Sequence, residues 1–514
     1  SDQVNRLASS IASYNDAIAV AASNGQQPND LLDAREEAVR QLSTFIGVTV
    51  VPQDDNSLNL FVGSGQPLVV GSTTSRLEVV PGQGDPSRFE VNFVSGGSSQ
   101  GITSLITGGE LGGLIRYRAE SLDPTLNSLG RLALAVSDQV NTQLGQGLDL
   151  KGQVGTALFG DFNDAATAAL RVRAYSTNTS NVQPALNITD SSVLTTSDYR
   201  LEFDGSSYSA RRLSDGEALT IAPNPPGSYP ATMTFTDAAG RDQGFEFALD
   251  SAPAAGDRFL LQPTRRGATS ISAVLDQPDQ LAFAAPLRAE ANLQNRGNAV
   301  IGQPSIDNVQ DPLVPADLQA LSPLTMTYAE PVAPATTGTL TLSAPGGVTV
   351  SPASLNITPG QSNSLSYTIT SGGSTLEVSQ TFSGRPAEGD QFTLDYNQNG
   401  VSDNRNALKL VDLQSKQTVG VDPTVTGIAT GVSFTDGYGD LVERVGTLTA
   451  QARQDSEATS AILKQATDNR DSLSGVNLDE EAANLIKFEQ YYNASAQIIQ
   501  VARSLFDTLI NSFR

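Results

Sequence analysis

Apolar residues recur every three or four positions at both ends of the chain, and this spacing predicts amphipathic helices. A first helix carries one apolar seam before residue 24, and a second ends at Gly47. A third follows Gly112-Gly113 and should pack through its own seam. The seams of the first and third helices are Val4, Leu7, Ile11, Tyr14, Ile18 and Ala21, and Leu122, Leu126, Leu129, Ala133, Val136 and Val140.

The helical period returns after Gly439 and is most regular at the C-terminal end. One seam runs from Leu441 to Leu473, and a break follows at Ser474-Gly475. The last seam alternates intervals of three and four residues, which is the spacing of a coiled coil and predicts a long terminal helix over 479–514. Its positions are Leu485, Phe488, Tyr492, Ser495, Ile499, Ala502, Phe506, Leu509 and Phe513.

Between the helical ends the pattern changes to period two, which is typical of β-strands. Two strands flank a polar turn at 54–57, and strands dominate from about 167 to 413. The motif PAxGDxFxL occurs twice, at Pro253–Leu261 and at Pro386–Leu394. We therefore expect two related β-rich modules in which Phe259 and Phe392 are buried at equivalent positions.

These patterns predict a multi-domain α+β protein. A discontinuous, rod-like helical domain would be built from both chain ends, with two inserted β-rich modules and a long, coiled-coil-like C-terminal helix. The expected parts are 1–165 (helical with a β-hairpin), 166–302 (first module), 303–414 (second module), 415–478 (helical domain, C-terminal part) and 479–514 (terminal axial helix).

Composition excludes several function classes. Lys and Arg number 31 against 55 Asp and Glu, a net charge of −24, so nucleic acid is not an expected partner. The chain has no Cys and no His, which removes thiol nucleophiles, serine–histidine triads and imidazole metal sites. No apolar run reaches the roughly 18 residues of a membrane-spanning helix. We expect no catalytic residue, cofactor or resident metal.

Two polar motifs resemble functional sites but have simpler explanations. Asp395-x-Asn397-x-Asn399-Gly400 matches the start of an EF-hand loop, but Asn406 stands where the loop needs a bidentate Glu. A polar turn at the end of a strand is the better interpretation. The acidic run 479–481 offers paired carboxylates, but at a helix N-terminus such acids offset the helix dipole.

Four longer strings resemble bacterial flagellar proteins. The string SGVNLDEEAANLIKFEQYYNASAQIIQVARSLFDTLINSF (474–513) resembles the C-terminal segment of flagellar rod and hook proteins. Three others resemble the hook-associated protein 1 family, which joins the flagellar hook to the filament. They begin NDLLDAREEAV (29–39), GGELGGLIRYRAESL (108–122) and SDNRNALKL (402–410).

The resemblance implies a non-catalytic structural protein that is exported unfolded by the flagellar type III system and works outside the cell, in the flagellum. It implies self-association into an axial ring or helical zone. The other implied partners are the hook protein, the second junction protein and an export chaperone at the C-terminal helix. Members of the family begin with a further N-terminal helix, so the resemblance also implies that this chain is truncated at its N-terminus.

The terminal seam is the expected contact surface for another subunit or for a chaperone. A helix this long needs a facing helix, and the remaining seams leave none unpaired. The expected contact residues are Leu485, Phe488, Tyr492, Ile499, Phe506, Leu509 and Phe513. Two alternatives stay open, namely an adhesin-like β-sandwich binding protein with helical ends and the flagellin-like second junction protein.

Overall fold

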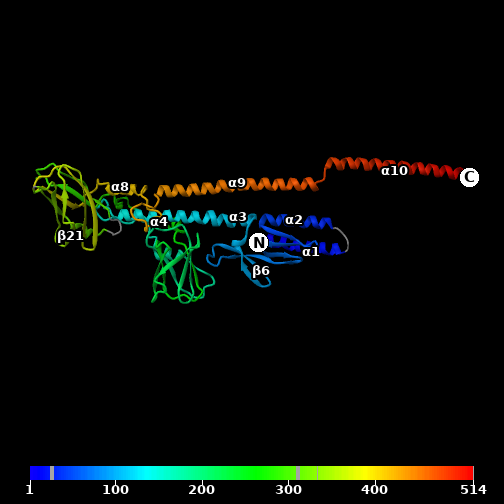
Figure 1. Ribbon diagram of the computed structural model, residues 1–514, viewed down its shortest axis with the longest axis horizontal. Coiled ribbons are helices and arrows are strands. Elements are labelled where there is room, and N and C mark those ends of the chain that lie inside the picture. The colour runs from blue at the N-terminus through cyan, green and yellow to red at the C-terminus, as the bar shows by residue number, and fades with distance from the viewer. Residues whose placement is uncertain (24–27, 308–312, 333, 513–514) are drawn as a thin grey trace. The chain divides into compact units, whose positions relative to one another are not determined.

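A computed structural model describes residues 1–23, 28–307, 313–332 and 334–512 (Figure 1). The chain divides into two compact units, Ser1–Val442 and Glu443–Arg514. Helices lie toward both ends of the chain and strands fill its middle, so the predicted mixture of helix and sheet is confirmed. The predicted packing of the first helices against the helix at 440–473 spans both units and stays a prediction.

The N-terminal part pairs two helices with two small sheets. Helix α1 (Asp2–Ser23) packs on α2 (Asn29–Phe45), and its predicted seam is the buried one, with Ile11 and Ile18 almost inaccessible. The predicted hairpin is present as β1 and β2, within a four-stranded sheet that a three-stranded sheet accompanies. These strands are β1 (Val48–Pro52), β2 (Leu58–Val62), β3 (Gln66–Val70), β4 (Thr73–Thr74), β5 (Arg76–Pro81), β6 (Phe89–Ser95) and β7 (Ser98–Gly101).

The third helical segment leaves the first half of its predicted seam exposed and buries the second half only in part. It consists of α3 (Gly109–Tyr117), a π-helical turn η2 (Arg118–Leu122) and α4 (Asp123–Gly145). Leu122, Leu126 and Leu129 remain 37–38 % exposed. The buried face instead contains Asn127, Gly130, Leu132, Leu134, Ala135, Ser137, Gln143 and Leu144. These contacts concern the first unit alone, so the predicted packing of the apolar seam with the other helices stays a prediction.

Glycine explains why the other face is used. A Cβ on Gly130 would lie 1.7 Å from the carbonyl oxygen of Thr264, and one on Gly267 would lie 2.2 Å from that of Gly130. The short helix α6 (Gly267–Ser270) therefore crosses α4 almost backbone to backbone. This close approach fixes the first β-rich module on α4.

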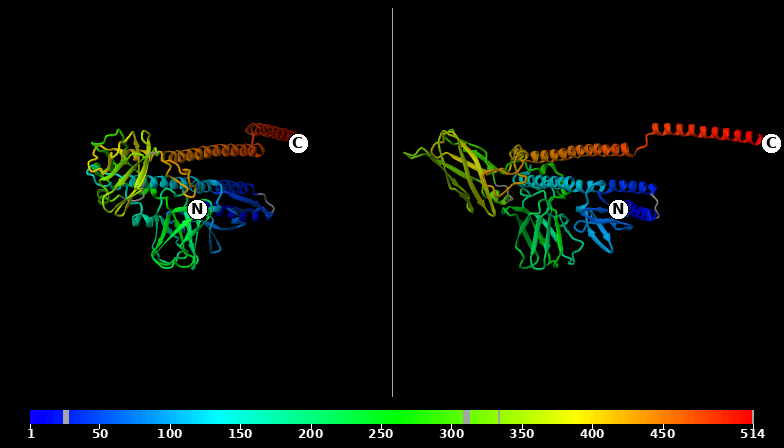
Figure 2. Two further views of the ribbon diagram at one scale, coloured as in Figure 1. Left: turned by 60° about the vertical axis from the view of Figure 1, so that its left-hand side comes forward. Right: turned by 45° about the vertical axis from the view of Figure 1, so that its right-hand side comes forward.

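Residues 172–261 form one antiparallel, eight-stranded sheet that follows the short helix α5 (Ala165–Leu170). Its strands, in sheet order, are β8 (Val172–Ala174), β15 (Arg258–Leu261), β10 (Tyr199–Phe203), β11 (Tyr208–Arg212), β12 (Ala218–Ala222), β13 (Ala231–Thr236), β14 (Asp242–Leu249) and β9 (Pro184–Ile188). Alternate side chains point into one core, where the ring of Phe259 lies 5.5 Å from that of Phe247. Figure 2 shows these strands in green as one body.

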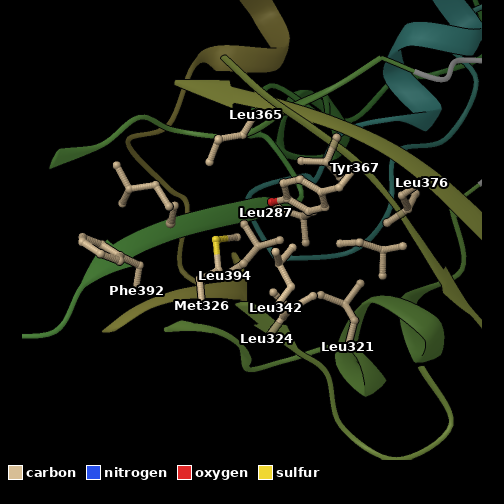
Figure 3. Close-up of a cluster of buried hydrophobic side chains, with 14 of the residues drawn as sticks. Leu287, Leu321, Leu324, Met326, Leu342, Leu365, Tyr367, Leu376, Phe392 and Leu394 are labelled. Carbon is tan, nitrogen blue, oxygen red and sulfur yellow. The ribbon is translucent and has the colours of Figure 1, made fainter. Parts of the chain in front are cut away.

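Residues 287–396 form a sandwich of two further antiparallel sheets. In one sheet the strand order is β16 (Leu287–Ala291), β25 (Gln391–Tyr396), β19 (Leu324–Ala329), β20 (Gly338–Ser343) and β22 (Ser354–Ile357). The other orders β17 (Val300–Ile301), β24 (Ser374–Ser383), β23 (Asn363–Ser371) and β21 (Val348–Ser351), and β18 (Ser305–Ile306) also pairs with β24. Side chains from both sheets meet in the core, including Met326, Tyr367 and Phe392 (Figure 3).

Strands on both sides of residue 303, where the second module was expected to begin, belong to this sandwich. Strand β16 pairs with β25 and strand β17 with β24, although both lie before residue 303. Alternation of apolar residues marks a strand but not its pairing partner, so the sequence did not place these strands in the second module. The remaining short elements are η1 (Thr103–Leu105), η3 (Pro278–Gln280), α7 (Pro315–Ala320) and α8 (Arg405–Asp412).

The repeated motif occupies equivalent strands in the two modules, as predicted. Phe259 and Phe392 are both fully buried, each on a strand that lies between the entry strand of its module and another antiparallel strand. The motif glycines, Gly256 and Gly389, have φ values of +89° and +81°, which favour glycine at the turn before each strand.

The two motif aspartates hold matching turns. The carboxylate of Asp257 accepts the backbone N–H groups of Thr179 (2.9 Å) and Ala254 (3.0 Å). The carboxylate of Asp390 accepts those of Arg296 (2.8 Å) and Ala387 (2.9 Å). Each aspartate therefore ties the turn that follows the entry strand to the turn before the motif strand.

In each module an asparagine adds two hydrogen bonds to those of the aspartate. Asn178 exchanges two hydrogen bonds of 2.8 Å with the backbone of Arg258, and Asn295 does the same with Gln391. The shared contacts extend the likeness of the two modules well beyond the nine-residue motif. We call each Asn–Asp pair, with the turns it binds, the module clasp.

Two long helices end the chain. Helix α9 (Phe434–Ser474) begins in the first unit, where Val432 and Phe434 pack against a small cluster formed by Leu132, Ala135 and Val419. Helix α10 (Leu478–Ser512) lies wholly in the second unit. The acidic run 479–481 occupies the first turn of α10, and the Asn477 side chain accepts the backbone N–H of Asp479 at 3.0 Å, so these acids lie at a helix N-terminus as predicted.

Candidate assembly surface

Helix α10 exposes every seam residue that the structure describes. The accessible fractions run from 55 % for Leu509 to 76 % for Tyr492. The other exposed seam residues are Leu485, Phe488, Ile499 and Phe506. Phe513 lies outside the described residues. One helix therefore presents six large apolar side chains at coiled-coil spacing, and burial of each stabilises a contact by roughly 1.5–3 kcal/mol.

A second exposed row lies beside this seam and was missed from the sequence. Tyr491, Ile498 and Leu505 recur at intervals of seven and are 57–68 % exposed. Each directly precedes a seam residue, so large residues occur as the doublets Tyr491-Tyr492, Ile498-Ile499 and Leu505-Phe506. The doublets were the sequence signal that could have revealed the second row, because the seam of a strict two-stranded coiled coil has only one large residue at such positions.

A buried polar node joins α4 to the two chain segments that flank the sandwich, one just before it and one on α8. The side-chain amide of Asn406, on α8, donates to the carbonyl oxygens of Gln143 (3.0 Å) and Ala282 (2.6 Å). The Gln143 side chain donates in return to Asn406 Oδ1 at 2.7 Å. Three segments distant in sequence thus meet at one amide, whose donor and acceptor atoms are both used.

Neighbouring residues of the SDNRNALKL string support this node. Arg405 pairs with Asp403 at 2.7 Å and donates to the carbonyl oxygen of Leu287 at 2.7 Å. Lys409 donates to the carbonyl oxygen of Ile306, and burial lowers the pKa of its ammonium group. A cavity of about 200 Å³ lies between these groups and α4. These contacts fix the first strands of the sandwich in place, and all of them join residues of this chain.

A charged clamp joins α4 to the first module and to the N-terminal sheets. Arg265 donates to Asp123 (2.6 Å), Asn127 (2.7 Å) and Asp198 (2.7 Å). Arg88 binds the same carboxylate of Asp123 through two nitrogens, each at 2.6 Å. Bidentate pairs of this kind give the orientation of a joint as well as its strength.

The EF-hand-like segment is a polar turn, as expected. The Asn397 side chain donates to Ala285 O at 2.9 Å and to Asp403 Oδ2 at 2.8 Å, and Asp395 accepts a hydrogen bond from Ser322. Across the described residues, no group of three or more Asp and Glu side chains gathers in a way that could hold a metal ion. Within the same residues, no helix is long and apolar enough to cross a membrane.

Comparisons with known proteins place these features in one family. Sequence profiles match residues 1–159 to the flagellar hook-associated protein FlgK helical domain, 174–263 to the D2-like domain of flagellar hook-associated protein 1, and 457–512 to the C-terminal part of flagellar basal body rod FlgEFG proteins. The solved hook junction protein FlgK of Burkholderia pseudomallei aligns over 92 % of this chain and 83 % of its own, with 33 % identity and a TM-score of 0.73. The chain belongs to the flagellar hook-associated protein 1 family.

Two curated relatives agree with this family assignment. Flagellar hook-associated protein 1 of Escherichia coli K12 is 28 % identical over 99 % of this chain and 69 % of its own length. The protein of the same name from Salmonella typhimurium LT2 is 28 % identical over the same shares. The rod-protein profile covers all the described seam residues of α10.

Proposed function

We propose that this chain is a structural component of the bacterial flagellum that joins the hook to the filament as an axial junction adaptor. Its family supports this reading over an adhesin-like protein and over the second, flagellin-like junction protein. The proposal assigns no catalytic residue and no cofactor. Such a protein has a mechanical role. It presents one contact surface to each neighbouring protein and holds these neighbours at a fixed distance from each other.

The observation that carries the proposal is the exposed seam of α10. Six large apolar side chains on one 35-residue helix are left in water, and helices gain most of their stability from packing. We assign the contact with neighbouring subunits to Leu485, Phe488, Tyr492, Ile499, Phe506 and Leu509, and to Phe513 from the sequence alone. The same face would bind an export chaperone before assembly, since an amphipathic helix fits an apolar groove.

The rest of the proposal concerns partners and place. In the assembled junction the partners are other copies of this chain, the hook protein and the second junction protein. The site of action is outside the cell, reached by type III export. The first unit would carry the two β-rich modules on α4, held there by the Arg265 clamp and the Asn406 node.

Replacement of Phe506 or Leu509 by Asp tests the proposal. A charge on the seam must be buried unpaired on assembly, which costs several kcal/mol, so the variants should fail to hold filaments. The substitutions are introduced at the chromosomal locus, and filaments on cells and flagellin shed into the medium are counted. Gln497→Asp, on the polar side of the same helix, is the matched control and should keep its filaments. Normal filaments on cells that carry Phe506→Asp would refute the proposal.

A further inference from the structure

The turn through which the chain leaves the sandwich of residues 287–396 contains the pair Asn399-Gly400. Asn399 is exposed, and its side-chain amide makes no hydrogen bond within the part of the chain that the structure describes. Its neighbour Asn397 differs, because that side chain is buried and donates to Ala285 O and to Asp403. The amide of Asn399 is therefore free to rotate and open to water.

The fold favours glycine directly after this asparagine. A Cβ on Gly400 would lie 2.6 Å from Asn397 Nδ2 and 3.1 Å from the Cβ of Ala284. The carbonyl oxygen of Gly400 accepts the backbone N–H of Asp403 at 2.9 Å, but the N–H of Gly400 itself donates no hydrogen bond to any described residue. The nitrogen of Gly400 is therefore neither shielded by a side chain of its own nor held by an acceptor.

We propose that Asn399 is a site of spontaneous deamidation, a covalent modification that needs only this chain and water. Asparagine is one of the thermolabile residue types. The backbone nitrogen of Gly400 gives its proton to water or hydroxide and attacks Cγ of Asn399. A new C–N bond closes a cyclic imide, the bond from Cγ to the side-chain nitrogen breaks, and that nitrogen takes a proton from water and leaves as ammonia.

Water then opens the cyclic imide at either of its carbonyl carbons. Opening at one carbon gives aspartate at position 399, and opening at the other gives isoaspartate, in which the main chain runs through the former side chain. Over the whole sequence, water is consumed and ammonia is released, and no oxidant or reductant takes part. The reaction does not depend on assembly, so this inference does not rest on the proposed function.

Asn56-Ser57 is a matched pair that the structure protects. Asn56 is also exposed and also lies in a turn. Its successor Ser57 is buried, and the backbone N–H of Ser57 donates to the carboxylate of Asp55 at 2.9 Å. The attacking nitrogen is thus occupied and carries a side chain beside it. We expect Asn56 to keep its amide under conditions in which Asn399 loses it.

The isoaspartate form should loosen the exit from the sandwich. Its main chain is longer by one carbon, which must be fitted between Asn397 and Asp403. Both of these residues are fixed, since the N–H of Asn397 donates to Pro286 O at 3.0 Å and Asp403 pairs with Arg405 at 2.7 Å. The added length therefore pulls on contacts that hold the start of α8.

Ageing of the purified full chain tests the proposal. The folded protein is kept at pH 7 and at pH 9, then digested with pepsin in acid, and the peptides are separated and identified by mass spectrometry. We expect aspartate and isoaspartate at position 399, with more of both at pH 9 because the attacking nitrogen must lose its proton. Asn399→Gln, an exposed amide that would have to close a larger ring, is the control and should stay unchanged.

Two results would overturn the modification site. One is an intact amide at position 399 in the folded chain at pH 9 while a sample unfolded in urea converts there, because the fold would then protect the turn. The other is conversion of Asn56 before Asn399. Hydrogen exchange across 405–412 tests the effect on α8: it should be faster in the aged parent chain than in the fresh one, and equal in aged and fresh Asn399→Gln. Equal exchange in the aged and fresh parent chain would overturn the loosening.

Discussion

The backbone N–H of Asn397 donates a hydrogen bond to the carbonyl oxygen of Pro286 at 3.0 Å. The chain therefore enters and leaves the sandwich of residues 287–396 at a single point, where Leu287 pairs with Tyr396 as the first residue pair of the antiparallel strands β16 and β25. The first module is built in the same way, because Val172 pairs with Leu261 and Gln262 donates to the carbonyl oxygen of Arg171 at 2.8 Å.

Removal of residues 287–396, with Pro286 joined to Asn397, should leave the remainder of the first unit folded. The two new neighbours are already within hydrogen-bond distance, so closing the chain requires little backbone movement. Hydrogen exchange across 172–261 should be unchanged, and the shortened chain should still hold filaments. Rapid exchange throughout 172–261 would show that the eight-stranded sheet depends on the sandwich.

Replacement of Asp390 by Asn should loosen the sandwich at neutral pH. Asp390 accepts three backbone N–H groups, and the side-chain amide nitrogen of Asn would face at least one of them as a second donor. Leaving a buried donor unpaired costs about 1–3 kcal/mol. Denaturant unfolding should show a loss of this size, whereas Asp276→Asn, at an exposed position, should show none.

Acid should reduce the difference between Asp390→Asn and the parent chain. Burial opposes ionisation of Asp390, but the backbone N–H donors outweigh it and lower the pKa of the carboxyl below its usual value. The stabilising effect is therefore complete above the unfolded-state pKa of about 3.9 and is lost as the pH falls through the folded-state pKa. An unchanged difference in unfolding free energy at pH 2 would contradict this linkage.

Replacement of Gly130 by Ala should separate α4 from the first module. The new methyl carbon would lie 1.7 Å from the carbonyl oxygen of Thr264, so one backbone must move. Overpacking of this kind costs about 3 kcal/mol or more and should lower the midpoint of thermal unfolding by about 5 °C or more. Gly145→Ala, in the last turn of the same helix, meets nothing within 4 Å and is the matched control.

Sequence patterns predicted those elements whose buried faces are apolar and regular. The seam of α1, the strand pair around residues 54–57 and both motif phenylalanines follow directly from hydrophobic periodicity. The repeated motif predicted that Phe259 and Phe392 are equivalent because its glycine, aspartate and phenylalanine each have a fixed geometric role.

The misses have physical causes. The buried face of α4 contains Asn127, Gly130 and Ser137, because a backbone crossing and the polar clamp occupy it, and apolar periodicity does not detect either contact. The second row on α10 was missed because only one large residue of each doublet was assigned to the seam. The clasp asparagines, Asn178 and Asn295, lie in turns, where polar residues give no periodic signal.

The central claim is that α10 is stabilised by neighbours in the assembled flagellum. Hydrogen exchange across 478–512 in a verified monomer, compared with the same peptides in isolated flagella, tests it most directly. We predict rapid exchange in the monomer, because a helix without packing is marginal in water, and strong protection after assembly. Strong protection of 485–512 in the monomer would contradict the account, since the seam would already be satisfied before any subunit arrived.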